Sequence, residues 1–137
     1  MFNWFQKKKR ATVLLVDDES AVILPLKERL EANDYEVITA CNGQQGLVRA
    51  ITRHPDLILL DTNMPYMTGI QMLERLREHH AGRHMTVMMV TGCKVIDNVN
   101  NADKLGVEDY VTKPFNTHEL MMKIENLLQR KGVLEPV

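Results

Sequence analysis

The chain has 137 residues, of which 45% are hydrophobic and 26% charged, which is the composition of one globular domain and not of a disordered chain. No apolar run approaches the roughly 20 residues of a membrane-spanning helix. In the first ten residues the charges follow the apolar part, whereas in a signal peptide they precede it. The two cysteines lack CxxC spacing, which argues against a zinc site or a disulfide framework. We therefore expect a cytoplasmic protein.

The charge is distributed unevenly along the chain. Four of the 17 Lys and Arg residues are Lys7 to Arg10, so the other 127 residues carry 13 cations against 18 acids, a net charge of −5. An acidic body argues against direct nucleic-acid binding, which needs basic patches. The aromatic and basic residues 1–10 could rest on a membrane surface, but so short a segment without a lipid binds weakly. We expect residues 1–10 and 132–137 to be tails.

From residue 12 on, short apolar runs alternate with amphipathic stretches five times, without a linker. This α/β alternation predicts one domain with a parallel sheet. The first, third and fourth apolar runs show no alternation of polar and apolar residues, which is typical of central strands covered on both faces. The predicted strands are Thr12 to Val16, Glu36 to Ala40, Asp56 to Leu60, Met85 to Val90 and Asp109 to Thr112.

Apolar residues three or four apart predict amphipathic helices between and after these strands. The expected inward stripes are Ile23, Leu26 and Leu30 in the first helix, and Leu120, Ile124, Leu127 and Leu128 in the last. Asn116 should cap the last helix at its start, while Pro25 should kink the first helix or delay its start. The segment before Gly106 contains three asparagines, so its helix should be the most mobile of the five.

Polar side chains follow the predicted strands, at the sheet edge where open parallel sheets bind ligands. They are Asp17, Asp18, Asp61, Thr91 and Lys113. Carboxylates that lie close together repel one another, and a hard cation such as Mg²⁺ relieves that repulsion. The cation and Lys113 together suit a phosphoryl group, to which Thr91 can donate a hydrogen bond. Asp61 is the best placed nucleophile, so the predicted product is an aspartyl phosphate.

These residues stand in recognisable motifs: the Asp-Asp pair, Asp-Thr-Asn-Met-Pro-Tyr-Met-Thr-Gly at 61–69, Thr-Gly at 91–92 and Tyr-Val-Thr-Lys-Pro-Phe at 110–115. With them, residues 11–131 resemble the receiver domain of bacterial two-component response regulators. The resemblance implies a flavodoxin-like (βα)₅ doubly wound fold with strand order 2-1-3-4-5. No further domain follows residue 131 in this sequence, so the chain is similar to the stand-alone regulators, such as the chemotaxis response regulator.

The resemblance implies a role for each acid of the site. Asp61 would accept the phosphoryl group from a phosphohistidine on a sensor histidine kinase or a histidine phosphotransfer protein. Asp18, Asp61 and the main-chain carbonyl of Asn63 would hold Mg²⁺, and Asp17 would act through a metal-bound water. The domain would thus catalyse its own phosphorylation and slow dephosphorylation.

The resemblance also implies a switch. Lys113 and Thr91 would bind the phosphoryl oxygens, and movement of the Thr91 loop would let Tyr110 turn inward. The face formed by the fourth helix, the fifth strand and the last helix would change and would bind a downstream output protein. A phosphorylation-dependent population shift of this kind needs only differential contacts in two states. Whether phosphorylation also produces a homodimer stays open.

Two other functions fit parts of the pattern. A phosphorylation-independent adaptor on the same fold is disfavoured because no site residue is missing. A Mg²⁺-dependent phosphatase with an aspartyl intermediate, similar to the haloacid dehalogenases, would need a second acid two residues after the nucleophile. That position is Asn63, so the phosphatase is the weaker alternative.

Overall fold

The computed structural model describes residues 8–92 and 102–136. In chain order its elements are β1 (Thr12–Val16), α1 (Ser20–Ala32), β2 (Glu36–Ala40), α2 (Gly43–Arg53), β3 (Leu57–Asp61), α3 (Gly69–Glu78), the 3₁₀ turn η1 (His80–Gly82), β4 (Val87–Thr91), β5 (Asp109–Thr112) and α5 (Thr117–Arg130). Residues 102–104, ahead of β5, are helical as well. Strands and helices thus alternate as the sequence predicts.

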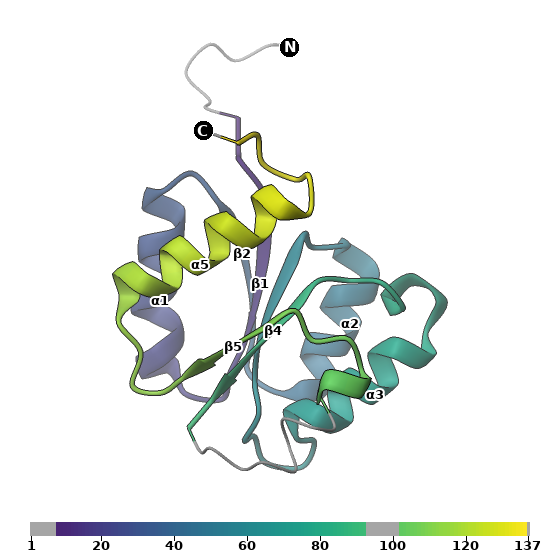
Figure 1. Cartoon of the computed structure of the whole chain (residues 1–137). Helices are drawn as coiled ribbons and strands as arrows, with labels where there is room; N and C mark the ends of the chain where they lie inside the picture. The colour runs from purple at the N-terminus through teal and green to yellow at the C-terminus, as the bar shows by residue number, and fades with distance from the viewer. Residues whose placement is uncertain (1–7, 93–101, 137) are drawn as a thin grey trace, which may run out of the picture.

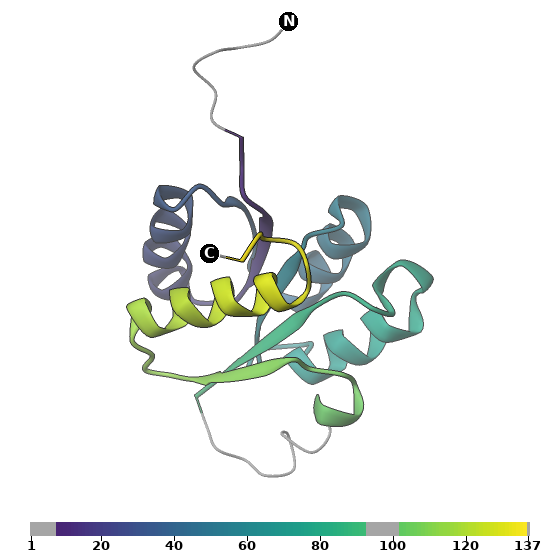
Figure 2. The same ribbon diagram turned by 45° about the horizontal axis from the view of Figure 1, so that its top comes forward.

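The five strands form one parallel sheet in the order β2-β1-β3-β4-β5. Strands β1, β3 and β4 are therefore the central ones, which confirms the interpretation of the three continuous apolar runs. Helices α1 and α5 cover one face of the sheet, and α2 and α3 cover the other (Figures 1 and 2). The predicted doubly wound fold is confirmed.

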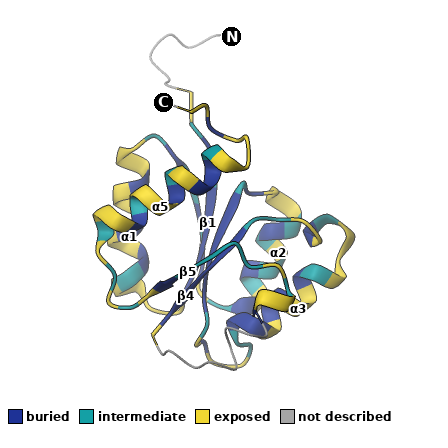
Figure 3. Ribbon diagram, in the orientation of Figure 1, coloured by how far each residue is buried: buried dark blue, intermediate teal, exposed yellow. Residues whose placement is uncertain are grey.

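Alternate residues of each central strand enter two separate hydrophobic clusters, one on each face of the sheet. In β1, Val13 and Leu15 pack toward α1 and α5, while Leu14 and Val16 pack toward α2 and α3. Figure 3 shows the strands buried and the helices exposed along their outer sides. The predicted inward stripes are all buried: Ile23, Leu26 and Leu30 of α1, and Leu120, Ile124, Leu127 and Leu128 of α5.

The start of α5 agrees with its prediction, whereas the start of α1 is earlier than one of the two predictions for it. Asn116 accepts a hydrogen bond from the backbone N–H of Glu119, which confirms the predicted cap of α5. Helix α1 starts at Ser20 and contains Pro25, so the delayed start considered for this helix does not occur. Glu19 occupies its N-cap position without a side-chain capping bond. The loop before α1 is therefore fixed by other contacts, described below.

Two predicted strands lie slightly later in the chain than expected. Strand β3 covers Leu57–Asp61 instead of 56–60, because Asp56 is engaged outside the ladder: its carboxylate accepts the backbone N–H of Thr12 at 2.8 Å. Strand β4 covers Val87–Thr91 instead of 85–90. As a consequence, Asp61 and Thr91 are the last residues of their strands and are held by the sheet itself.

Some predictions concern residues outside the described ranges. Residues 1–7 of the predicted N-terminal tail lie outside these ranges, and so does the asparagine-rich part of the predicted fourth helix, within 93–101. Arg10 is described: its backbone N–H donates to Asp34, and its guanidinium pairs with Glu125 at 3.0 Å. In the ranges that are described, no helix combines the length and the apolar character needed to cross a bilayer.

Candidate functional site

The predicted site residues lie at the carboxyl edge of the sheet. Asp17 directly follows β1, Asp61 ends β3, and Thr91 ends β4 beside Thr112 of β5. Lys113 follows β5, and its backbone N–H donates to the carbonyl of Thr91 at 2.7 Å. The parallel sheet thus brings together residues that are up to 96 positions apart in sequence.

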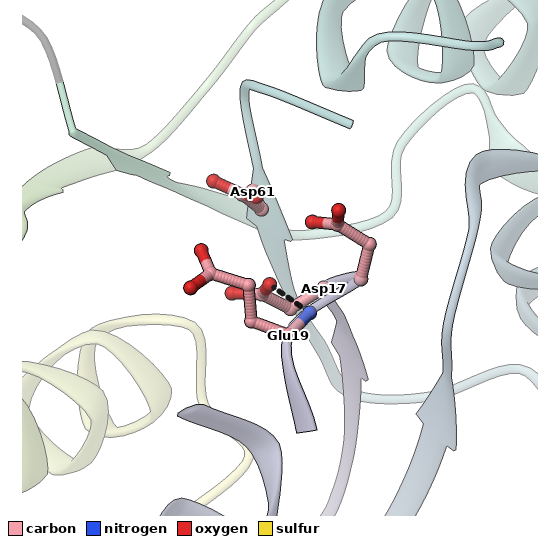
Figure 4. Close-up of side chains that lie close together, drawn as sticks. Asp17, Glu19 and Asp61 are labelled. Atoms are coloured by element: carbon pink, nitrogen blue, oxygen red, sulfur yellow. Dashed lines mark hydrogen bonds between the residues drawn. The ribbon is translucent and has the colours of Figure 1, made fainter. Parts of the chain in front are cut away.

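Four carboxylates gather at this edge. Oxygen atoms of Asp17, Asp18, Glu19 and Asp61 all lie within 4.8 Å of one another. Asp17 and Asp61 are buried, while Asp18 and Glu19 are exposed, and Figure 4 shows the loop after β1 placing Asp17 and Glu19 beside Asp61. Several hard oxygen donors on a partly open site are the ligand set that Mg²⁺ prefers, so the residues present fit this ion.

Lys113 is the cation of the site. Its ammonium lies 2.8 Å from an oxygen of Asp17, 3.4 Å from Asp61 and 3.4 Å from Glu19. Burial alone would lower the pKa of Lys113, but the hydrogen bond to Asp17 and the charges of Asp61 and Glu19 outweigh it and raise the pKa. Lys113 is therefore a fixed positive charge facing the acidic residues.

Asp61 is the acid with the most perturbed ionisation. Its pKa is raised from 3.8 to about 6, chiefly by burial and secondly by the neighbouring Asp17 carboxylate. The Lys113 ammonium and the backbone N–H of Asn63 act in the opposite direction and only partly compensate. An additional cation beside Asp61 would remove the remaining cost of its charge.

The chain after Asp61 turns sharply into α3, and glycine makes this turn possible. A Cβ atom on Gly69 would lie 2.1 Å from the carbonyl oxygen of Asp61, so no other residue fits without displacing the backbone. Gly69 also donates its N–H to the carbonyl of Thr62 at 3.1 Å. A capping box of Thr68 and Gln71 fixes the start of α3 directly behind the site.

Tyr110, the predicted switch residue, lies outside the cluster of four carboxylates. Its ring packs against the hydrophobic cluster on the α2 and α3 face, and its hydroxyl donates to the carboxylate of Asp103 in the short helix before β5. Asn63 and Tyr66, in the loop after β3, are exposed, and Tyr66 has a positive φ of 68°. Thr91 is buried at the end of β4.

Glu19 is the residue of the site that the sequence did not single out. It contacts Lys113, and its backbone N–H donates to Asp17 at 2.9 Å. The available signal was its place as the third acid of the run Asp17-Asp18-Glu19. An acid just before a helix is commonly a solvated N-terminal residue, so the run alone did not indicate a contact across the sheet.

Comparison with known proteins agrees with this architecture. The family model described as response regulator receiver domain matches residues 13–125. The alkaline phosphatase synthesis transcriptional regulatory protein PhoP of Bacillus subtilis is 35% identical over 124 residues, which cover 90% of this chain and 51% of that protein. The phosphate regulon transcriptional regulatory protein PhoB of Pseudomonas aeruginosa is 36% identical over 121 residues, 88% of this chain and 53% of that protein. The chain spans about half the length of these relatives.

Solved structures of single receiver domains match over nearly their full length. A CheY-like response regulator receiver domain protein from Methanospirillum hungatei superimposes with a TM-score of 0.84 at 30% identity, covering 92% of this chain and 98% of that chain. The chemotaxis response regulator CheY4 of Vibrio cholerae gives a TM-score of 0.80 at 29% identity, covering 86% and 98%. Family, relatives and fold agree, and the chain belongs to the response regulator receiver domains of two-component, phosphorylation-based signalling systems.

Proposed function

We propose that this chain is a stand-alone response regulator in which Asp61 accepts a phosphoryl group from a phosphohistidine of a sensor kinase or a histidine phosphotransfer protein. The observation that carries the proposal is the position of Lys113, whose ammonium contacts both Asp17 and Asp61 at the edge where four carboxylates meet. An acid held beside a fixed ammonium, in a site whose donors suit a divalent cation, is equipped to bind and receive a phosphoryl dianion.

The proposed transfer needs little chemistry from the protein beyond positioning. An oxygen of the Asp61 carboxylate forms a bond to phosphorus while the phosphorus–nitrogen bond of the donor breaks, and the nitrogen keeps the electron pair. In this proposal Lys113 would hold oxygens of the group in transfer, and Thr91 would donate a hydrogen bond to another. Hydrolysis of the acyl phosphate later restores Asp61.

Receiver domains generally use Mg²⁺, and the acidic cluster of this chain fits it. We propose that Asp18, Asp61 and the main-chain carbonyl of Asn63 hold the ion and that Asp17 contacts it through water. When bound, Mg²⁺ would supply positive charge against the phosphoryl oxygens. Metal removal should therefore prevent phosphorylation of Asp61.

We further propose that phosphorylation changes the face around the fourth helix, β5 and α5, with Thr91 and Tyr110 as switch residues. The hydroxyl of Tyr110 donates to Asp103, which lies in the segment of the chain between Thr91 and β5, so a shift of this segment would release the ring. A downstream output protein in the cytoplasm would bind the changed face, and a homodimer is one form that the output could take. The acidic body gives no support for direct nucleic-acid binding.

The phosphorylation of Asp61 can be tested directly. Wild-type protein incubated with Mg²⁺ and acetyl phosphate should gain the mass of one phosphoryl group, and Asp61→Asn should gain none, since an amide is not a comparable nucleophile. EDTA should abolish the gain in wild type. Equal gain in both proteins would contradict the assignment of Asp61, and no gain in wild type would favour the phosphorylation-independent adaptor.

The stand-alone status needs a separate experiment, because the curated relatives are about twice as long. An antibody raised against this chain should detect a native protein of about 15.8 kDa in extracts of the source cells. A product of about double that mass would show that the domain is part of a longer regulator.

A further inference from the structure

We infer that Glu19 is a positioning residue, which holds Lys113 in the unphosphorylated protein and must release it when a phosphoryl group arrives. The inference rests on the proposed function, because it concerns the lysine that would bind the phosphoryl oxygens. The Glu19 carboxylate and the incoming phosphoryl group would thus compete for Lys113.

The ammonium of Lys113 is fully engaged by carboxylates. It contacts Asp17 at 2.8 Å, Asp61 at 3.4 Å and Glu19 at 3.4 Å. A lysine has three N–H donors, so three carboxylates account for all of them. A phosphoryl oxygen can bind Lys113 only when one of these contacts is given up.

Glu19 is the partner that can leave most easily. Asp17 is buried, and its second oxygen already accepts the backbone N–H of Glu19, so its position is fixed. Asp61 carries the incoming group. The Glu19 side chain is 59% exposed, so water can solvate its carboxylate as soon as the contact with Lys113 breaks. Figure 4 shows this side chain turned toward Asp17 and Asp61, where the competition would take place.

Removing the competitor should speed phosphorylation. Glu19→Gln keeps the length of the side chain but loses the ion pair, so we expect the rate of phosphorylation of Asp61 to rise roughly two- to fivefold, the range that an exposed ion pair supports. The matched control is Glu28→Gln, which removes one exposed acid from α1, the helix that follows Glu19, without changing a contact of Lys113. Its rate should equal that of wild type.

A second comparison separates release of Lys113 from simple repulsion of an anionic donor. Acetyl phosphate is a dianion at neutral pH, whereas phosphoramidate is a monoanion. A repelling Glu19 would slow the dianion more, while a Glu19 that occupies Lys113 slows both donors by the same factor. Glu19→Asp retains the charge but is one methylene shorter, so it withdraws from Lys113 and should behave like Glu19→Gln with both donors.

All rates are measured at Mg²⁺ concentrations that saturate each variant, determined by titration. An unchanged rate in Glu19→Gln, an increase confined to acetyl phosphate, or a wild-type rate in Glu19→Asp would each overturn the inference while leaving the proposed function intact. If wild type takes up a phosphoryl group from neither donor, the proposed function fails and the inference fails with it.

Discussion

Asp61 is kept in surroundings that oppose its charge. It is buried at the end of β3 next to a second buried carboxylate, and its pKa is raised to about 6. The folded protein therefore holds a proton on Asp61 more tightly than the unfolded chain does, unless a cation takes the place of that proton. Asp61, the proposed phosphoryl acceptor, thus lowers the stability of the metal-free fold near neutral pH.

This predicts an unusual pH dependence in EDTA. Since the folded pKa of Asp61 lies above the unfolded one, its contribution to stability is fully present below pH 3.8 and is lost as the pH rises through about 6. Between pH 4.5 and 7.5 the free energy of unfolding should fall by about 2 kcal/mol more in wild type than in Asp61→Asn. Urea denaturation of both proteins at the two pH values measures this difference, and parallel curves would rule it out.

At the level of residues, the sequence predicts the acids and the lysine because their strand ends must meet at one sheet edge. Asp17, Asp18, Asp61 and Lys113 do meet there. The contact between Glu19 and Lys113 could not be predicted, because it depends on the path of the loop after β1. A hydrogen bond from the backbone N–H of Glu19 to the Asp17 carboxylate holds that path, but this local bond does not by itself direct the Glu19 side chain toward Lys113.

The junction of β3 and α3 is the most tightly packed connection near the site. Gly69 lies against the main chain of Asp61, and the capping box of Thr68 and Gln71 closes the first turn of the helix. The sequence motif 61–69 predicts a turn and a helix start. It does not by itself show that the glycine is needed for close approach, because the clash involves the carbonyl of a residue eight positions earlier.

Gly69→Ala should therefore destabilise the fold strongly. The added methyl group would lie 2.1 Å from a backbone oxygen, which has no free rotation to give way, so we expect a loss of more than about 2 kcal/mol in the free energy of unfolding. Gly92→Ala is the matched control, since a Cβ there meets no atom of residues 8–92 and 102–136 within 4 Å. Thermal or urea unfolding of the two variants should differ clearly, and similar stabilities would refute the packing argument.

Element boundaries show what a single sequence leaves undetermined. Apolar runs located all five strands, but β3 and β4 begin later than predicted. The residues just before these two strands bond to the neighbouring strand without joining the ladder: the Asp56 carboxylate accepts the N–H of Thr12, and the carbonyl of Thr86 accepts the N–H of Ile58. Pairing of this kind depends on the neighbouring strand and carries no signal in the strand's own residues.

Among the described residues, two hydrophobic clusters are separated by the sheet, and one of them includes both Ala11 and Leu134. Leu134 is 8% exposed and belongs to the cluster under α1 and α5, and its backbone N–H donates to Leu128. On the same side, the Arg10 guanidinium lies 5.1 Å above the ring of the buried Tyr35. The packed part of the chain therefore includes both Arg10 and Leu134.

Leu134→Ala should lower the free energy of unfolding by about 2 kcal/mol, because it leaves a cavity at the end of α5. The neighbouring Val133 is 37% exposed, so Val133→Ala should change stability by less than about 0.5 kcal/mol. Chemical denaturation of both variants provides the measurement. A loss in Val133→Ala as large as in Leu134→Ala would mean that the packing of this segment is not specific to Leu134.

The start of β1 and the end of α5 lie at the same end of the molecule (Figures 1 and 2), whereas the acidic residues lie where β1 and β3 end. Domains with neighbouring ends often accept circular permutation. A circular permutant would join the present chain ends by a short glycine–serine linker and would open new ends at the exposed His54, between α2 and β3. This change would alter the order of the strands along the chain. The proposed phosphorylation of Asp61 should survive that rearrangement, because the proposed site lies where the strands end and both changes lie where strands begin.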